Sequence, residues 1–190
     1  MTELRELLDV PADLPVPVDD GASDHLPGMR LPSVALPATD AQFVDLSKLP
    51  ARSVVYVYPR TGQPDQPLPP GWDEIPGARG CTPQSCAYRD LAAELAALGA
   101  RVFGLSTQET TYQREAAERL HLPFPLLSDE RLQFATALAL PTFEVDGMTV
   151  IKRLTVVIDD GAIETVFYPV FPPDADAGHV AAWLRTHQDA

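Results

Sequence analysis

The run from Ser53 to Tyr58 constrains the fold most, because five of the six residues in SVVYVY are β-branched or aromatic. A continuous apolar run without polar alternation is typical of a strand that is covered on both faces. We therefore expect a central strand here, in a sheet that carries helices on both sides.

Helical and strand patterns alternate after this run. A stripe of Leu91, Leu95 and Leu98 predicts a helix over 82–98, and Gly99 follows where a helix-ending glycine belongs. The remaining pattern predicts strands at 101–105, 124–127, 149–158 and 162–170 and helices at 111–120, 131–138 and 177–187. This order indicates an α/β fold with a mixed central sheet.

The segments before and after the central strand are rich in proline. Leu4, Leu7 and Leu8 have helical spacing, and a proline-rich stretch follows them. We interpret residues 1–25 as an N-terminal arm and residues 26–190 as one domain. Two short apolar runs at 33–36 and 42–46 predict a β-hairpin extension. The stretch 59–80 holds six prolines and four glycines, and a loop of this length in a compact domain indicates a functional role.

The charge and the termini exclude several classes of function. A net charge of −13 without a run of Lys and Arg argues against binding to nucleic acid or to an anionic membrane. The first twenty residues lack the basic start and apolar stretch of a secretory signal, so we expect a cytoplasmic protein. Two cysteines in a reducing compartment favour redox chemistry over a permanent disulfide.

Cys81 is the first candidate for chemistry, because it falls at the start of the helix predicted after the long loop. Unpaired backbone N–H groups and the helix dipole stabilise a thiolate at this position. The thiolate is the nucleophilic form of cysteine, so this placement favours a reactive sulfur.

Cys86 follows five positions later, which in an intact helix gives a Cα separation of about 8.5 Å. A disulfide requires less than about 7 Å, so the first helical turn would have to unwind before Cys81 and Cys86 could join. Pro83 in this turn is compatible with such opening. The spacing alone equally allows two reduced cysteines that only fill the core.

Other polar residues give weaker signals. His25, His121, His179 and His187 are scattered, so they support neither a Cys-His pair nor a zinc site, and we expect no metal and no bound cofactor. Trp72 in the long loop is interpreted as an anchor for that loop.

The segment GCTPQSCAYRD around Cys81 resembles the active-site stretch of the peroxiredoxins, in particular the Q, or bacterioferritin-comigratory-protein, subfamily. LGARVFGLST, LPFPLLSD and KRLTVVIDDG resemble later strands of that family in the same order, so the similarity covers roughly residues 25–188. The resemblance implies a thioredoxin fold, Cys81 as the peroxide-attacking residue, Cys86 as the resolving residue and Arg153 as a donor near the thiolate. Without it, Arg153 would be read as a solvent-facing charge on a strand, and Arg60 or Arg79 could serve instead.

One departure from the family pattern concerns the peroxide-binding groups. The family has proline seven residues before the reactive cysteine and threonine or serine three before it, where this chain has Glu74 and Ala78. The stretch 60–80 is longer than the family's loop, so we expect Pro59 and Thr61, together with Gly80, to contact the substrate.

The sequence thus predicts a thiol peroxidase that acts on hydrogen peroxide or an organic hydroperoxide, with thioredoxin or another dithiol as reductant and a monomeric state. A thiol-disulfide oxidoreductase is one alternative, although such exchangers usually carry C-x-x-C. A non-catalytic redox sensor is the other, and the missing hydroxyl at Ala78 favours it.

Overall fold

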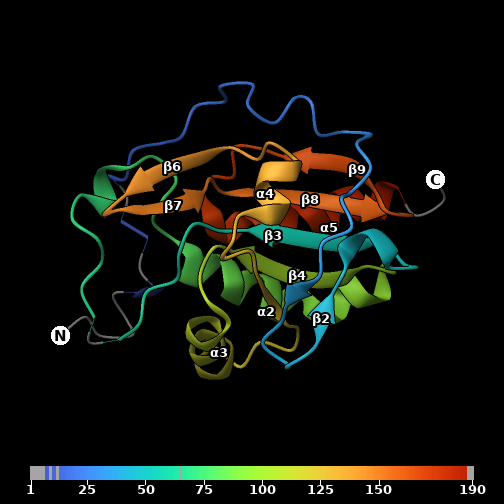
Figure 1. Cartoon of the computed structure of the whole chain (residues 1–190), viewed down its shortest axis with the longest axis horizontal. Coiled ribbons are helices and arrows are strands. Elements are labelled where there is room, and N and C mark those ends of the chain that lie inside the picture. The colour runs from blue at the N-terminus through green and yellow to red at the C-terminus, as the bar shows by residue number, and fades with distance from the viewer. Residues whose placement is uncertain (1–6, 9, 12, 65, 188–190) are drawn as a thin grey trace.

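A five-stranded mixed sheet forms the centre of the molecule, which we describe from a computed structural model (Figure 1). The structure describes residues 7–187 apart from 9, 12 and 65. The strand order is β5-β4-β3-β8-β9, with bounds β3 (Ser53–Val57), β4 (Arg101–Ser106), β5 (Leu126–Ser128), β8 (Leu154–Asp159) and β9 (Ala162–Phe167). The predicted central strand is confirmed, because β3 pairs parallel with β4 and antiparallel with β8 and all five of its residues are buried.

Alternate residues of β3 feed two cores, one on each face of the sheet. Val54 and Tyr56 belong to the core that also contains residues of α2 (Cys81–Ala97) and α5 (Asp176–Thr186). Val55 and Val57 belong to the other, which α4 (Gln133–Ala137) covers. Figure 1 shows α4 on the opposite side of the sheet from α2 and α5, while α3 (Thr110–Arg119) lies against β5. The expected mixed sheet with helices on both faces is therefore confirmed.

The prediction of one long strand over 149–158 is wrong. This stretch contains β7 (Met148–Ile151) and β8, and β7 pairs with β6 (Thr142–Val145), which the sequence reading missed. Asp146 and Gly147 both have positive φ and make the turn between β6 and β7. The main chain then leaves the hairpin at Lys152, whose amide donates to the Pro141 carbonyl at 2.8 Å. Arg153 consequently lies between two strands instead of inside one.

The boundaries of β5, α4 and β9 also differ from those expected. β5 begins at Leu126, two residues later than predicted, because Pro125 has no N–H to donate to a neighbouring strand. Helix α4 is shorter than the predicted 131–138, since Leu132 adopts a left-handed φ of 54° immediately before it. β9 ends at Phe167, three residues earlier than predicted. The ends of α2, α3 and α5 agree with prediction to within one residue.

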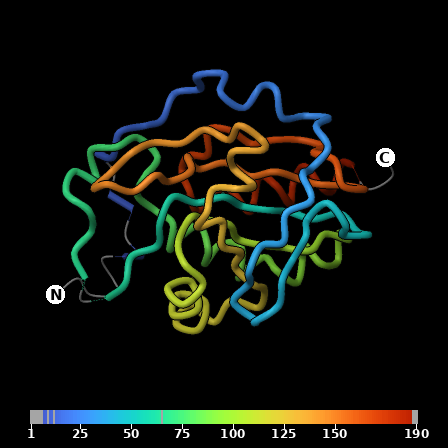
Figure 2. The backbone as a smooth tube through the Cα atoms, in the orientation of Figure 1, coloured from blue at the N-terminus to red at the C-terminus, as the bar shows by residue number. Residues whose placement is uncertain are grey.

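The N-terminal segment runs along the outside of the sheet, beyond β9 (Figure 2). The amides of Gly28 and Leu31 donate to the carbonyls of Ile163 and Gly161 at 2.7 and 2.9 Å, so this segment pairs with the edge strand. The predicted hairpin is present as β1 (Leu36–Pro37) paired antiparallel with β2 (Phe43–Val44), followed by the short 3-10 helix η1 (Leu46–Lys48). Of the predicted helical stretch, Leu7 and Leu8 are helical while Leu4 lies outside the described residues, and the domain boundary at 25 stays a prediction.

Within the described part of the chain, none of the helices combines the length and the apolarity that a bilayer crossing requires.

Candidate active site

Cys81 is the first residue of α2, and it is only 3% exposed. It is a free cysteine, as is Cys86. The first N–H groups of a helix have no partner within the helix, and they concentrate the positive end of its dipole. The predicted placement of Cys81 at a helix start is therefore confirmed.

Gly80 makes this helix start possible. Its φ is +100°, a conformation that residues with a Cβ rarely adopt, and an added Cβ would overlap the ring of Pro173. Pro173 begins the 3-10 helix η3 (Pro173–Ala175), which leads directly into α5. Gly80 thus lets the main chain turn into α2 while η3 packs closely against it, whereas its predicted substrate contact stays a prediction.

Arg153 brings a positive charge to the Cys81 sulfur from the segment between β7 and β8. The residue is 3% exposed, and its Nη2 lies 3.2 Å from Cys81 Sγ. The same guanidinium donates to the carbonyls of Gly77, Ala78 and Arg79 at 3.3, 3.1 and 3.0 Å. The reading of Arg153 as a solvent-facing charge is therefore wrong, because the strand break at Lys152 turns this side chain inward. Arg153 both holds the turn that precedes Cys81 and supplies a cation that can stabilise a thiolate.

The other two arginines considered from the sequence have different partners. Arg79 pairs with Asp73 at 2.9 Å. Arg60 lies over the ring of Tyr112, with 4.6 Å between its guanidinium carbon and the ring centroid, and contacts Met148 Sδ at 3.7 Å. The guanidinium that contacts Cys81 Sγ is that of Arg153.

The long loop is fixed by an apolar cluster beneath it. Trp72, in the 3-10 helix η2 (Trp72–Glu74), is 3% exposed and packs with Ala78, Val145 and Val150. The β6–β7 hairpin, which contributes both valines, therefore anchors the loop, and the interpretation of Trp72 as an anchor is confirmed. Ala78 is fully buried in this cluster, so an apolar side chain suits this position.

Thr61 is held by Gln108. Its amide and its hydroxyl both donate to Gln108 Oε1, at 2.9 and 3.1 Å, and Gln108 Nε2 donates back to the Thr61 carbonyl at 3.2 Å. Thr61 and Pro59 are both buried. Within the described residues no hydrogen bond joins Thr61 to Cys81, and the substrate-binding roles of Pro59 and Thr61 stay predictions.

Cys86 lies in the second turn of α2 and is half-buried. Burial raises the pKa of its thiol, an effect that the charge of Arg89 partly offsets. The helix is continuous from Cys81 through Cys86, so the two sulfurs can meet only if its first turn opens. Cys86 is therefore a free thiol that an intact helix separates from Cys81.

Arg153 is held by a hydrogen-bonded network of Gln84 and Asp176 that the sequence analysis did not predict. Gln84, three residues after Cys81, accepts from Arg153 Nη1 through its carbonyl oxygen and donates from Nε2 to Asp176 Oδ2 at 2.8 Å. Asp176, the first residue of α5, is 1% exposed and also accepts from Tyr88 and Thr155 at 2.9 and 2.7 Å. Only the i, i+3 spacing of Cys81 and Gln84 could have hinted at this arrangement.

Arg153 also lines an apolar pocket of about 360 Å³, together with the N-terminal segment and residues 168–170. Part of its wall comes from Pro17 and Val18 of the N-terminal segment. Asp20 fastens this segment, since its carboxylate accepts from Lys152 Nζ and the Tyr168 hydroxyl, each at 2.7 Å. The N-terminal segment therefore lines the pocket into which Arg153 also faces.

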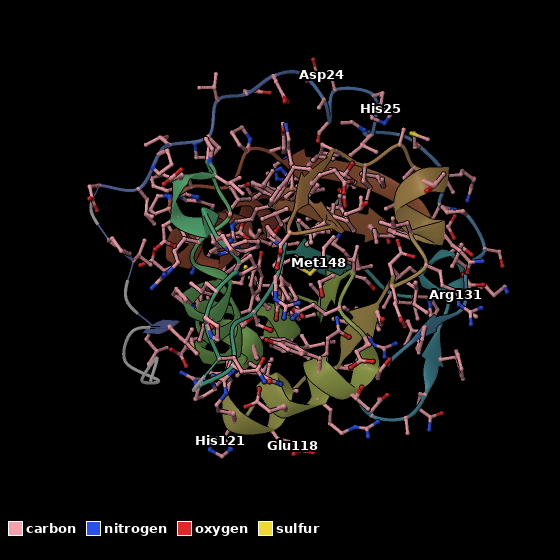
Figure 3. The ribbon with its side chains drawn as sticks, turned by 60° about the vertical axis from the view of Figure 1, so that its left-hand side comes forward. Asp24, His25, Glu118, His121, Arg131 and Met148 are labelled. Carbon is pink, nitrogen blue, oxygen red and sulfur yellow. The ribbon has the colours of Figure 1, made fainter. Side chains whose placement is uncertain are left out.

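The histidines do not contribute to the site. Figure 3 shows His25 and His121 at the surface on opposite sides of the molecule. His187 stacks on Trp183 with 4.1 Å between ring centroids. Across the residues that the structure describes, no three His, Cys, Asp or Glu side chains gather in a way that could hold a metal ion.

Comparison with known proteins assigns the family. The Redoxin family model matches residues 26–182. The chain is 32% identical over 161 residues to peroxiredoxin Q, chloroplastic, from Oryza sativa subsp. japonica, and the match covers 84% of this chain but only 66% of the rice protein. It is 30% identical to the peroxidoxin BcpB of Mycobacterium tuberculosis, whose crystal structure superposes with a TM-score of 0.70 over 85% of this chain and 98% of that one.

A bacterioferritin comigratory protein of Xanthomonas campestris has the same fold, with a TM-score of 0.67 over 93% of this chain and 100% of that chain at 19% identity. The matched segment runs through the strand, loop, helix start and arginine that form the site described above. The chain therefore belongs to the Redoxin family and is a peroxiredoxin of the Q, or bacterioferritin-comigratory-protein, type with a thioredoxin fold.

Proposed function

We propose that this protein is a thiol peroxidase that attacks peroxides with Cys81 and closes a disulfide with Cys86. The observation that carries the proposal is the 3.2 Å contact between Cys81 Sγ and Arg153 Nη2 at the start of α2. This contact unites the helix N-terminus and a buried guanidinium, which are two features that stabilise a thiolate.

In the first step the Cys81 thiolate attacks one peroxide oxygen and the O–O bond breaks. Cys81 becomes a sulfenic acid, and the other oxygen leaves as hydroxide or alkoxide and takes up a proton from solvent. Arg153 is placed to stabilise the negative charge on the leaving oxygen as well as the thiolate that attacks.

In the second step the Cys86 sulfur attacks the sulfenic acid, releases water and forms the Cys81–Cys86 disulfide. Burial raises the pKa of Cys86, so its thiol stays protonated on the intact helix. Opening of the first turn of α2 would expose this thiol and bring it within bonding distance. An external dithiol, for which thioredoxin is our candidate, would then restore both thiols by exchange.

A redox sensor is the second candidate, and the burial of Ala78 in an apolar cluster favours it. A peroxide at Cys81 would find no hydroxyl at this position, although such a donor helps to align the two oxygens. A sensor would form the same disulfide slowly and transmit the opening of α2 to a partner.

Stopped-flow fluorescence of Trp72 and Trp183 separates these functions. We expect the reduced protein to react rapidly with stoichiometric hydrogen peroxide, and Cys81→Ser to abolish the signal. Cys86→Ser should retain the first phase and lose the second, because only the resolving step needs that sulfur. A wild-type reaction no faster than that of free cysteine would refute the peroxidase and favour the sensor.

A further inference from the structure

Asp176 is a buried carboxylate with several donors but no partner in an ion pair. Its Oδ2 accepts hydrogen bonds from Gln84, Tyr88 and Thr155 at 2.8, 2.9 and 2.7 Å. None of the ion pairs among the described residues includes it. A buried carboxylate is costly unless its oxygens are satisfied, so a specific arrangement must retain it here.

The contact with Gln84 sets the direction of an amide. A glutamine side chain has a donor side and an acceptor side, and a carboxylate can only accept. Asp176 therefore takes the Nε2 side of Gln84, which leaves Oε1 to face Arg153 Nη1. The reverse orientation would set an amide N–H against the guanidinium and an oxygen against the carboxylate, and both contacts would be repulsive.

The Gln84 amide is the acceptor for Arg153 Nη1, the terminal nitrogen that does not contact the sulfur. Its Nη1 is held by Gln84, while Nη2 is shared between Cys81 Sγ and the two carbonyls of Ala78 and Arg79. Without an acceptor at Nη1, the planar guanidinium could rotate away from the sulfur.

Burial raises the pKa of Asp176, whereas its three donors and the charge of Arg153 favour the ionised form. Among the described residues no carboxylate contacts the Arg153 guanidinium directly. An ionised Asp176 would balance this buried positive charge from the far side of the Gln84 amide.

We infer that Asp176 is a positioning residue that orients the Gln84 amide and, through it, holds Arg153 against the Cys81 sulfur. This inference rests on the proposed function for its relevance to peroxide reduction, but the positioning itself can be measured without peroxide.

The first test is the rate at which iodoacetamide alkylates Cys81, in a Cys86→Ser background so that one thiol is followed. We expect Asp176→Ala to lower this rate about tenfold, because a misplaced Arg153 no longer stabilises the thiolate. The ultraviolet absorbance of the thiolate should fall in parallel.

The second test exchanges the two groups by combining Gln84→Glu with Asp176→Asn. In this double variant the carboxylate at position 84 would contact Arg153 without any need for amide orientation. Because Gln84 and Thr155 both contact Asp176 Oδ2, an asparagine whose Nδ2 takes that place can donate to the carboxylate at position 84 and to the Thr155 hydroxyl, which can rotate to accept. We expect the alkylation rate to return to within about threefold of the parent, which a purely structural role of Asp176 would not explain.

Asp129→Ala is the matched control. Asp129 is also a buried aspartate at a helix start, where it accepts from the amides of Phe134 and Ala135 at 3.0 and 2.7 Å, and it makes no contact with Cys81, Gln84 or Arg153 among the described residues. Its loss should lower stability without slowing alkylation.

The inference is overturned if folded Asp176→Ala is alkylated as fast as the parent, or if the exchanged variant folds and stays slow. Should Asp176→Ala not fold, the exchanged variant decides alone. A protein that shows these alkylation rates but reacts slowly with hydrogen peroxide would contradict the proposed function and leave the positioning role intact.

Discussion

At the scale of single residues, one guanidinium with five acceptors joins Cys81 to the residues around it. Arg153 contacts the sulfur, three carbonyls of the preceding turn and the Gln84 amide. A planar group with five fixed donors can serve these acceptors together, whereas an ammonium group has three donors and no fork.

Arg153→Lys should therefore slow the reaction of Cys81 with hydrogen peroxide, although the positive charge is kept. Loss of a charged hydrogen bond costs about 1.5–3 kcal/mol, which corresponds to a second-order rate constant about 10–150-fold lower in stopped flow. Arg52→Lys is the control, since Arg52 pairs with Glu164 and donates to the His187 carbonyl away from Cys81. Equal rates for Arg153→Lys and wild type would show that charge alone suffices.

At this scale the sequence predicted the cysteine and, through the family resemblance, Arg153 beside it, but not the hydrogen-bonded network that holds Arg153. Cys81 and its helix start were readable because a turn glycine, a loop and a leucine stripe lie next to one another in the chain. The contact of Gln84 with Asp176 joins residues 92 positions apart, and no local pattern encodes it. The residue pattern alone left the direction of the Arg153 side chain open, because that direction depends on the break between β7 and β8, and only the family resemblance implied its place near Cys81.

At the scale of elements, the proposed disulfide requires helix α2 to be stable at its far end and to open at its start. Its first residues are buried and held by η3 and Arg153, while Leu95 anchors the later turns in the core. Gly80 is the joint between the long loop and this helix, with φ at +100° and the Pro173 ring against its Cα.

Gly80→Ala should destabilise the fold more than Gly99→Ala, which affects the other end of the same helix. Both glycines have positive φ, but an added Cβ at Gly99 would meet no atom within 4 Å, whereas at Gly80 it overlaps Pro173. We expect Gly99→Ala to cost about 1–2 kcal/mol from backbone strain and Gly80→Ala more, measured as the free energy of unfolding in urea. Similar losses in both variants would mean that η3 can move away from the added Cβ without lowering the free energy of unfolding.

Most helices and strands were predictable from the sequence, whereas the β6–β7 hairpin was not. The strand β3 and the helix α2 were predicted correctly. The apolar residues of β3 are continuous, as burial on both faces requires, whereas those of α2 recur at helical spacing, as burial on one face requires. The β6–β7 hairpin was missed because apolar residues lie on both sides of Lys152 and Arg153, so one strand was predicted over 149–158 in spite of these two charges. The turn at Asp146 and Gly147 was the available signal.

At the scale of the whole molecule, the N-terminal segment links the outer edge of the sheet to the site. It pairs with β9, and Pro17 and Val18 form part of the pocket beside Arg153. Asp20 fastens it to Lys152 and Tyr168, and these hydrogen bonds lower the pKa of Asp20 from 3.8 to about 2.

This attachment predicts a specific pH dependence. Because the pKa of Asp20 is lower in the folded state, its contribution to stability is fully present above about pH 4 and is lost as the pH falls towards 2. Wild type should be more stable than Asp20→Asn at neutral pH, and the difference in free energy of unfolding should vanish near pH 2. Asp19→Asn is the matched control, since that carboxylate accepts only from the Gly21 amide among the described contacts. A difference that is constant with pH would refute the attachment.

The most direct test of the account is the mass of one peptide after the reduced protein has met one equivalent of hydrogen peroxide. Trypsin cleaves after Arg79 and Arg89, so Cys81 and Cys86 fall together in the peptide 80–89. We predict that this peptide loses two hydrogen atoms in the wild type, through an internal disulfide, and that Cys86→Ser instead gains oxygen on Cys81. Oxygen found on Cys86 with Cys81 still reduced, or cross-links only between separate chains, would contradict the account.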